Sequence, residues 1–367
     1  MTRDLIELII ILIGFGMTFL LFYRIPALPD APESPGQISI SVIIPARNEE
    51  TTLPLLLADL ARQTLAPTEV ICVDDASTDG TAAVAKRFGV RVLCIAEKPD
   101  GWLGKSWACQ TGANVAAGEL LLFLDADVRL RPDALSRIAA AYQANRQTLS
   151  VQPFHEAVAL YEQFSLFFNL VQIAANGTSL KSPVNLGLYG PVILIAKETY
   201  FEIGGHESVK DSIVEDMSLG ELLRKRSIPY RLFVGDSGLS FRMYPCGLGC
   251  LLQGWIKNLA AGAAKTPPWL FAAVFLWIAS ATSVPLHLFR AIAAYDWLSI
   301  AVYGALYFCW VAAVFMLMRR IGRFRFVAAL LYPLALAAFF ALFLVSIIKR
   351  IFGFRVRWKG RAIRPKR

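Results

Sequence analysis

The clearest fold signal in the chain is the stretch LLLFLDAD, residues 120–127, in which five apolar residues are followed at once by Asp125 and Asp127. A short, wholly apolar run predicts a strand that is buried on both faces, as strands are in a parallel sheet. The two carboxylates would then lie at the carboxyl end of that strand. In open α/β sheets this is the edge at which ligands bind.

The segments around this strand repeat the same alternation of short apolar runs with helical patterns. Strands are expected at 40–45, 69–74, 91–95 and 120–125, and helices at 50–63, 78–88, 107–117 and 132–145. This order predicts an α/β fold with a doubly wound, mostly parallel sheet. Polar clusters follow three of the strands: Arg47–Glu50, Asp74–Asp75 and Asp125–Asp127.

The composition indicates that part of the chain lies in lipid. It is 56% hydrophobic and 18% charged, whereas soluble domains average about 45–50% and about 25%. The apolar excess lies in residues 5–22 and in three stretches, 269–289, 297–318 and 326–348, each long enough to span a bilayer. We therefore expect an uncleaved anchor at 1–24, a linker at 25–37, a cytoplasmic domain at 38–265, membrane helices at 266–350 and a basic cytoplasmic tail at 351–367.

Charge supports this placement. The net charge is +9, and basic residues cluster beside the apolar stretches, at 319–325 and 349–367. Such residues favour the cytoplasmic face and anionic lipid, and no basic, aromatic-rich stretch suggests nucleic-acid binding. Three full crossings would carry the basic tail outside. We therefore expect 326–348, which contains Pro333, to be re-entrant or interfacial; the alternative is that all three stretches cross.

The Asp125-x-Asp127 pair suits a hard divalent cation, Mg²⁺ or Mn²⁺, shared with substrate phosphates. The alternative is a solvated loop or a helix cap ahead of Pro132. In Val73–Thr81, Ser77 or Thr78 could cap the next helix, but the two acids before them exceed what capping needs and could bind a nucleobase or ribose. No glycine-rich phosphate loop supports a dehydrogenase or P-loop enzyme. Six scattered cysteines without metal-site spacing are expected to be reduced thiols.

These motifs together carry a family resemblance. The runs IIPARNEE at 43–50, VDDASTDGT at 73–81 and DAD at 125–127 resemble family-2 glycosyltransferases of the GT-A fold. Further likeness runs to the end of the chain, through GWLGKSWA at 101–108, SVQPFH at 150–155, GGH at 204–206, FRMY at 241–244, QGWIKN at 253–258 and WKGR at 358–361. These later motifs resemble a branch of the family that acts on carotenoid carboxylic acids.

The resemblance implies roles for individual residues. The nucleotide-sugar would be bound by Pro45, Arg47, Glu49, Asp75, Lys105 and Asp125, and the metal by Asp127 with Asp125. Glu215 and Asp216 match the acidic pair that supplies the catalytic base, with Asp216 taking the acceptor proton. The alternative for this pair is two acids that stabilise a helix N-terminus, and for Lys105 a surface lysine after a glycine turn.

One departure from the family pattern limits what is implied. Many members carry Gln-x-x-Arg-Trp, which holds the diphosphate and the acceptor, but here the match is Gln253-Gly-Trp255 without the arginine. Arg242 or Lys257 could supply the cation, although lysine lacks the bidentate fork of arginine. We therefore expect transfer of a single sugar rather than processive polymerisation.

The implied reaction is inverting transfer of one sugar, glucose being expected, from a UDP-sugar to a membrane lipid acceptor. A carotenoid carboxylic acid is expected as the acceptor. Because a carboxylic acid titrates near pH 4–5, it would need no base, and Asp216 would be partly redundant. A hydroxylated lipid (ceramide-like, hopanoid or polyprenyl) would need one. The alternative from a different class is a non-catalytic lipid-handling membrane protein.

Overall fold

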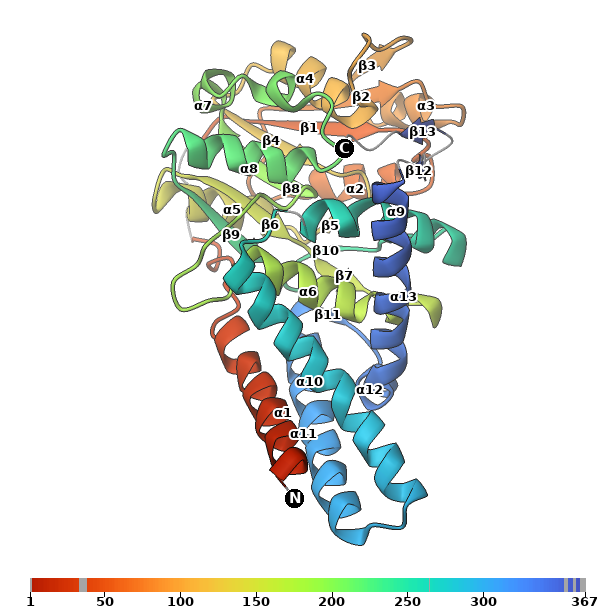
Figure 1. The fold of residues 1–367 in the computed structure, drawn as a ribbon. Coiled ribbons are helices and arrows are strands. Elements are labelled where there is room, and N and C mark those ends of the chain that lie inside the picture. Colours follow the sequence, from red (N-terminus) through yellow and green to blue (C-terminus); the bar gives the residue numbers. More distant parts are fainter. Residues whose placement is uncertain (1, 33–37, 264, 353–355, 359–360, 364–367) are drawn as a thin grey trace. The chain divides into compact units, whose positions relative to one another are not determined.

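The computed structural model describes residues 2–32, 38–263, 265–352, 356–358 and 361–363 (Figure 1). The chain forms two compact units. The first, here called the α/β unit, comprises Pro26–His155, Asn185–Met243 and Gly353–Arg367. The second, here called the membrane unit, comprises Met1–Ile25, Glu156–Val184 and Tyr244–Phe352.

The α/β unit is built on a seven-stranded sheet in the order β3-β2-β1-β4-β8-β6-β9 (Figure 1). Its strands are β1 (Ile40–Ala46), β2 (Glu69–Asp75), β3 (Arg91–Ile95), β4 (Leu120–Leu124), β6 (Thr148–Gln152), β8 (Val192–Ala196) and β9 (Tyr230–Val234). β8 runs antiparallel to both of its neighbours, and the other pairs are parallel. The predicted mostly parallel α/β fold is therefore confirmed.

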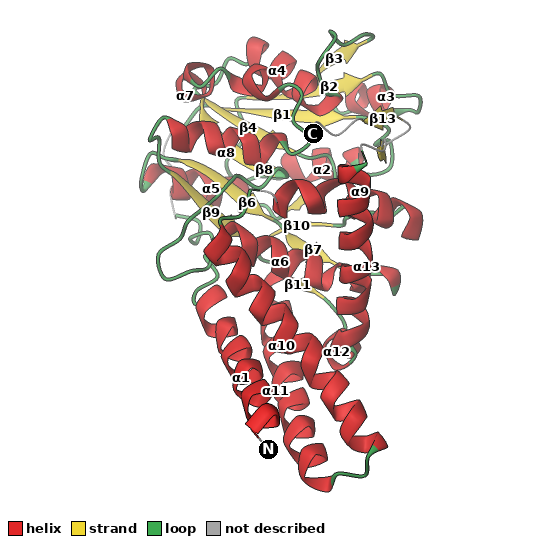
Figure 2. Ribbon diagram, in the orientation of Figure 1, coloured by secondary structure: helices red, strands yellow, loops and turns green. Residues whose placement is uncertain are grey.

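Helices cover both faces of this sheet (Figure 2). One face carries α2 (Leu53–Leu60), α3 (Thr81–Arg87) and α5 (Ala134–Gln143), and the other carries α4 (Gly104–Val115), α7 (Lys197–Glu202), the 3₁₀ helix η2 (Gly205–Val209) and α8 (Glu215–Lys225). Alternate strand residues supply the two cores: Val42 and Ile44 pack on the first face and Ile43 on the second. Burial on both faces explains why these strands read as continuous apolar runs.

Smaller elements complete the α/β unit. β10 (Leu239–Phe241) pairs antiparallel with β5 (Val128–Leu130) and parallel with β7 (Phe154–Glu156). The short strands β12 (Val356–Trp358) and β13 (Arg361–Ile363) form a hairpin within the stretch predicted to be a basic tail. At the start of the predicted linker, the Val234 N–H donates to the Pro26 carbonyl over 2.7 Å, so this part of the linker is fixed on β9.

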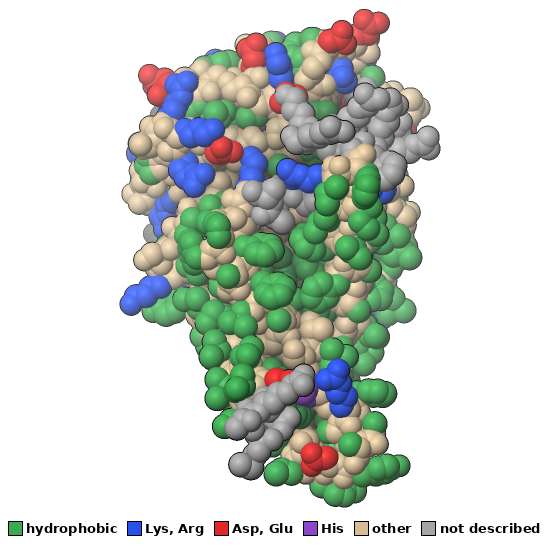
Figure 3. Space-filling view, viewed as in Figure 1, with side chains coloured by type: hydrophobic (Ala, Val, Ile, Leu, Met, Phe, Trp, Pro, Cys, Tyr) green, Lys and Arg blue, Asp and Glu red, His purple; other side chains and the backbone are tan. Residues whose placement is uncertain are grey.

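The membrane unit contains the apolar helices. They are α1 (Thr2–Leu21), η1 (Tyr161–Ser165), α6 (Leu166–Asn176), α9 (Leu248–Ala263), α10 (Pro268–Ala293), α11 (Trp297–Ile321), α12 (Phe326–Leu330) and α13 (Tyr332–Ile351), with the two-residue strand β11 (Gly322–Arg323). α10, α11 and α13 are long and apolar enough to cross a membrane, and Leu5–Leu21 of α1 is a shorter apolar helix. Apolar side chains cover the surface over these helices (Figure 3). These helices fit membrane anchoring.

α1, α10 and α11 pack side by side, and α13 meets α10 through its first residue, Tyr332. A Cβ on Gly14 of α1 would lie 2.5 Å from the Cβ of Ser280 on α10, so these helices approach closely. The apolar stretch 326–348 is divided at Leu331 into α12 and α13. α13 lies along α9 and against η1 and α6, and the Ser346 hydroxyl donates to the Ile256 carbonyl over 2.6 Å.

Two segments that we expected within the domain at 38–265 group, by compactness, with the apolar helices of the membrane unit. These segments, 156–184 and 244–263, contain η1, α6 and α9. Phe168 of α6 stacks on Trp255 of α9 with ring centroids 4.3 Å apart. Apolar aromatic faces on these helices explain why they pack with membrane helices rather than with the sheet.

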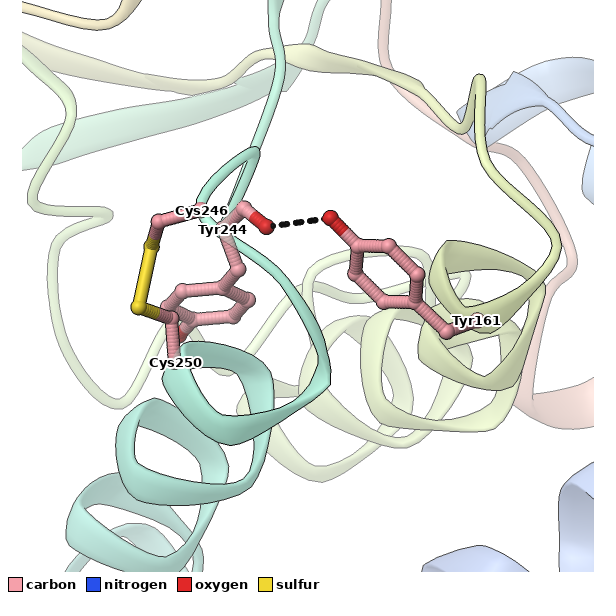
Figure 4. Close-up of a disulfide and its surroundings, with 4 residues drawn as sticks. All are labelled: Tyr161, Tyr244, Cys246 and Cys250. Carbon is pink, nitrogen blue, oxygen red and sulfur yellow. Dashed lines mark hydrogen bonds between the residues drawn. A yellow bond between two sulfur atoms is a disulfide. The ribbon is translucent and has the colours of Figure 1, made fainter.

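The loop before α9 also corrects one expectation from the sequence. Cys246 and Cys250 are joined by a disulfide, whereas we expected all six cysteines to be reduced thiols (Figure 4). Beside this disulfide, the Tyr161 hydroxyl donates to the Tyr244 carbonyl over 2.9 Å. Cys246 lies in the turn before α9 and Cys250 in the first turn of that helix, a proximity that a search for metal-site spacing does not reveal.

Candidate active site

Two of the predicted motifs interlock at the carboxyl ends of β1 and β2. Arg47 follows β1 and donates from one guanidinium nitrogen to the carbonyls of Asp75 and Ala76, over 2.6 and 2.8 Å. The Gly80 N–H donates to Glu50 over 2.6 Å and the Thr78 N–H donates to Asn48 over 2.9 Å. These bonds hold two loops from different strands as one surface.

The predicted nucleotide-binding residues of this surface lie together. Ala46 of β1 is paired in parallel register with Asp74 of β2, which places Pro45 and Asp75 at the same edge of the sheet. Asp75 is buried, while Pro45, Arg47 and Glu49 are partly exposed. A buried acid at this edge can accept hydrogen bonds from the donors of a base or a ribose.

A second cluster joins three segments that are distant in sequence. Lys105, the second residue of α4, lies with its Nζ 2.7 Å from Asp125 Oδ1 and 3.3 Å from Glu215 Oε1. The side chains of Lys105, Asp125 and Glu215 are 35%, 28% and 11% exposed, so the cluster remains open to a substrate. Lys105 is therefore part of the acidic centre and not an isolated surface lysine.

Three glycines bring Asp216 to this cluster. A Cβ on Gly187 would lie 2.6 Å from the Met217 Cα, and one on Gly220 would lie 2.6 Å from the Gly187 Cα, so α8 packs directly against the backbone that leads into β8. A Cβ on Gly190 would lie 2.8 Å from Asp216 Oδ2 and 3.4 Å from Lys105 Nζ. Asp216 and Lys105 therefore converge at Gly190.

The charges of the cluster perturb one another. Burial would lower the pKa of Lys105, but Asp125 and Glu215 outweigh this effect and hold the pKa well above its ordinary value, so the ammonium stays charged. Burial, followed by the charge of Glu215, raises the pKa of Asp216 to about 6, while Lys105 opposes the rise. A carboxyl that titrates near neutrality in an open cluster has the character of a general base.

The Asp125 and Asp127 carboxylates fit a divalent cation by their chemistry. Both are partly exposed oxygen donors that directly follow β4. Among the residues the structure describes, no group of three or more His, Cys, Asp or Glu side chains is placed to hold a metal ion. This donor set suits a cation that takes its remaining ligands from a bound diphosphate and from water.

The four residues predicted to contact the acceptor or the diphosphate are divided between the units. Arg242 follows β10 in the α/β unit and is partly exposed, whereas Gln253, Trp255 and Lys257 lie on α9 in the membrane unit. Gln253 is exposed and Lys257 partly exposed, but Trp255 is buried between Phe168 and Tyr244. Contact of these four with substrate stays a prediction.

Sequence reasoning did not assign a role to a buried polar group beside this cluster. It consists of Gln110 on α4, Tyr200 on α7 and His206 in η2, which are linked by hydrogen bonds. The Gly204-Gly-His206 motif was the signal present in the sequence. The three residues are too far apart along the chain for periodicity or spacing to join them.

Comparison with known proteins assigns this architecture to a family. Residues 41–162 match the family described as Glycosyl transferase family 2, and these residues include β1, β2 and β4 with their polar ends. The chain belongs to this family of glycosyltransferases and has its GT-A fold.

Comparison with individual proteins gives a more specific likeness within this family. The chain is 36% identical over 332 residues to the 4,4'-diaponeurosporenoate glycosyltransferase of Staphylococcus aureus strain USA300, a match that covers 88% of each protein. The protein of the same name from strain MRSA252 is 35% identical over the same length. A solved mannosyltransferase of Pyrobaculum calidifontis, in complex with GDP-Man and Mn²⁺, shares the fold with a TM-score of 0.55 and 17% identity, covering 95% of this chain and 99% of that one.

Proposed function

We propose that this protein transfers a single sugar, glucose, from a UDP-sugar to a carotenoid carboxylic acid such as 4,4'-diaponeurosporenoate, giving a glycosyl ester. The observation that carries the proposal is the extent of the match to the Staphylococcus aureus enzymes. It runs over 332 residues, which is more than the α/β unit contains, and therefore extends into the membrane unit. A shared membrane unit favours a shared class of lipid acceptor.

The reaction is a single in-line displacement at the anomeric carbon. An acceptor oxygen attacks C1 of the sugar on the face opposite the diphosphate. The bond from C1 to the β-phosphate oxygen breaks, its electron pair leaves with UDP, and the configuration inverts. Lys105, held charged beside Asp125, supplies preorganised positive charge for the departing diphosphate.

A divalent cation held by Asp125 and Asp127 would neutralise charge on the diphosphate when bound. Mn²⁺ accompanies the nucleotide sugar in the mannosyltransferase that shares this fold. Pro45, Arg47, Glu49 and Asp75 bind and orient the nucleotide from the carboxyl ends of β1 and β2. Arg242, Gln253, Trp255 and Lys257 are assigned to the diphosphate and the acceptor.

The acceptor determines how much Asp216 contributes as a base. A carotenoid carboxylate has an ordinary carboxyl pKa and arrives without its proton, so Asp216 would be partly redundant as a base. A lipid hydroxyl must lose its proton during transfer, and Asp216, with a pKa raised to about 6 by burial and by Glu215, would accept it. Asp216→Asn should therefore cost about 10²-fold or more with a hydroxyl acceptor and much less with a carboxylate.

The linkage of the product tests the acceptor class. Membranes that contain the full-length protein would be supplied with UDP-[¹⁴C]glucose and 4,4'-diaponeurosporenoic acid, and the labelled lipid would be treated with mild alkali. A glycosyl ester releases its glucose under these conditions, whereas a glycoside of a hydroxylated lipid keeps it. Alkali-stable label in the native lipids would favour the ceramide-like, hopanoid or polyprenyl alternative.

The variant Asp127→Asn tests whether the protein is a catalyst or only handles lipid. If the folded variant no longer forms the labelled product that the wild type forms, the protein is a catalyst. A protein that only binds lipid would show no label with either form. The open, charged cluster of Lys105, Asp125 and Glu215 favours catalysis, since lipid binding has no need for it.

We also propose that the α/β unit faces the cytoplasm, where UDP-sugars are made, with the basic tail on the same side. Support comes from the density of Lys and Arg at 349–367, which favours the cytoplasmic side, and from the division of the apolar stretch 326–348 at Leu331. Arg364→Cys, in protein whose exposed native cysteines are replaced, would be probed with an impermeant thiol reagent. Labelling of intact cells would contradict a cytoplasmic tail.

A further inference from the structure

A buried polar chain lies against the acidic cluster without belonging to it. Gln110, Tyr200 and His206 are 6%, 0% and 2% exposed. The Tyr200 hydroxyl lies 3.0 Å from Gln110 Oε1 and 2.9 Å from His206 Nδ1, and it accepts the His206 backbone N–H over 3.0 Å. Such a network in a low-dielectric interior is stabilising only if every member is satisfied.

A backbone N–H determines the direction of each side-chain hydrogen bond in this network. The Glu207 N–H donates to Gln110 over 3.1 Å, so the atom of Gln110 that faces Tyr200 must be its oxygen. An amide oxygen carries no proton, and the single hydroxyl proton of Tyr200 must therefore point to it. If that proton pointed to His206 instead, two oxygen lone pairs would face each other at 3.0 Å.

The assignment at Tyr200 determines the tautomer of His206. With its proton given to Gln110, the tyrosine oxygen can only accept, so His206 Nδ1 must carry a proton and donate it. Burial lowers the pKa of His206 to about 4, an effect opposed by Glu215 and assisted by Lys105, so the ring is neutral near pH 7. A neutral ring protonated at Nδ1 leaves Nε2 as an unprotonated acceptor.

The network of Gln110, Tyr200 and His206 joins the elements that carry the reacting groups. Gln110 lies on α4, which also carries Lys105, and His206 lies in η2, which packs against α4 and α8. The His206 ring packs edge-on against Phe123, two residues before Asp125, with centroids 5.1 Å apart. A Cβ on Gly205 would lie 2.6 Å from the Tyr200 ring and 2.8 Å from Gln110 Oε1, which leaves this junction no room to shift.

We propose that Gln110, Tyr200 and His206 are positioning residues that hold Lys105 in register with Glu215 and Asp216, with His206 fixed as the Nδ1–H tautomer. The network joins α4, which carries Lys105, to η2, which packs against α8, so it acts on the chemical step more than on nucleotide binding. This inference rests on sugar transfer at the Lys105 cluster but not on the identity of the acceptor.

The tautomer can be observed without any assay of activity. The chain has three histidines, so full-length protein labelled with ¹⁵N-histidine in lipid bilayers gives few ring signals, and His206→Asn identifies those of His206. We expect one protonated nitrogen, with its proton on Nδ1, and one bare nitrogen at pH 7. A proton on Nε2 would overturn the assignment.

Two substitutions of His206 repeat this test in kinetics. The side-chain amide of asparagine can place a donor near the position of Nδ1, whereas that of glutamine reaches the position of Nε2. His206→Asn should retain transfer within about threefold, and His206→Gln should lose about 10-fold or more, since small misplacements of reacting groups have effects of this size. The reverse order would overturn the proposal.

Tyr200→Phe removes the central oxygen and should lower kcat by about 10–100-fold. KM for UDP-glucose should change less than about twofold. Tyr142→Phe, in a buried tyrosine of α5 on the opposite face of the sheet, is the matched control and should leave both constants unchanged. An unchanged kcat in folded Tyr200→Phe would overturn the positioning role, whereas an inactive wild-type protein would instead count against the proposed function.

Discussion

Buried polar groups are used differently around the acidic cluster of the α/β unit and inside the membrane unit. In the α/β unit, polar side chains bind one another or the backbone across long stretches of sequence, as Tyr200 binds Gln110 and as Ser150 both donates to the Tyr189 carbonyl and accepts its N–H, each over 2.7 Å. In the membrane unit, hydroxyls cap carbonyls of neighbouring helices: Ser280 donates to Ile11 over 2.6 Å and Tyr332 to Ala281 over 3.1 Å.

Buried polar groups therefore have a different purpose in each unit. The polar network of the α/β unit fixes the position of charges, whereas the polar contacts of the membrane unit fix the spacing of helices whose interior is aromatic, with Trp277 and Trp310 at its centre. Lipid provides no hydrophobic drive between helices, so close packing and hydroxyl contacts hold them. Substitutions in the α/β network should therefore change kcat first, and those between helices should change stability first.

The largest effect expected on the catalytic side comes from removal of metal. EDTA should abolish transfer, and Mn²⁺ or Mg²⁺ should restore it, since Asp125 and Asp127 provide only part of a coordination shell that the diphosphate completes. Without UDP-sugar, the melting temperature of the protein in detergent should change little in chelator, because the two carboxylates alone offer only part of a coordination shell. Full activity in chelator would remove the metal from the mechanism.

Loss of the Lys105 charge is the next largest effect. Lys105→Met should lower kcat by about 10²–10³-fold, the range found when one preorganised donor to a developing charge is removed. Lys86→Met, at an exposed position of α3, is the matched control and should leave kcat unchanged. A loss below about threefold for Lys105→Met would show that the cluster does not serve the leaving group.

The ionised carboxyl of Asp216 is expected to lower the stability of the folded protein. Because its pKa is raised on folding from 3.8 to about 6, the folded state is penalised only when the carboxyl is ionised. The penalty is absent below about pH 4 and complete above about pH 6. Asp216→Asn should therefore be about 2–3 kcal/mol more stable than wild type at pH 7.5, with the difference vanishing near pH 4, as followed by thermal unfolding.

Asp236 provides a control for the direction of this change in stability. The hydrogen bonds from Arg137 hold the pKa of Asp236 below its ordinary value, so this carboxylate stabilises the fold above its unfolded pKa, and the benefit is lost as the pH falls. Asp236→Asn should therefore destabilise the protein at pH 7.5. Equal shifts in the same direction for both variants would contradict this account.

Helix spacing in the membrane unit is tested by two glycines of α1. Gly14→Ala would bring a methyl group 2.5 Å from the Ser280 Cβ and should destabilise the protein by about 1–3 kcal/mol, as overpacking does. Gly16→Ala is the matched control, since its Cβ would have nothing within 4 Å. Equal melting temperatures for the two variants would show that α1 and α10 are not tightly packed.

The smallest effect expected concerns the polar contact between Glu7 of α1 and His287 of α10. Glu7 Oε2 lies 3.0 Å from His287 Nε2, and Glu7→Gln should cost about 0.6 kcal/mol, the average for polar contacts between membrane helices. Glucose transfer by the variant should equal that of wild type. A large loss of transfer would mean that this pair serves the reaction, and the distinction between the two units would fail.

The sequence predicted the strands of the sheet well because their signal is local. Leu120–Leu124 is apolar in every position since it is buried on both faces, and Asp125 directly follows it. The polar ends of β1, β2 and β4 could be placed together because parallel strands share an edge. The insertion of antiparallel β8 between β4 and β6 depends on long-range pairing and left no such signal.

The sequence identified the residues at the centre of the site but not the contacts between them. Lys105, Asp125 and Glu215 come from three distant segments, and their approach depends on Gly187 and Gly220, which in the sequence are two unremarked glycines. Trp255 was assigned to substrate by resemblance, yet it is buried between aromatic rings. The disulfide of Cys246 and Cys250 was missed because the spacing alone does not distinguish paired from free thiols.

The division of both units into separate stretches of chain has a consequence for biosynthesis. The seven-stranded sheet cannot close until β9, which ends at Val234, has left the ribosome. Translation proceeds at about 5–20 residues per second, so α1 is exposed to the targeting machinery well before a catalytic fold exists. A complete sheet therefore forms only after residues 156–184, which group with the apolar helices, have also been synthesised.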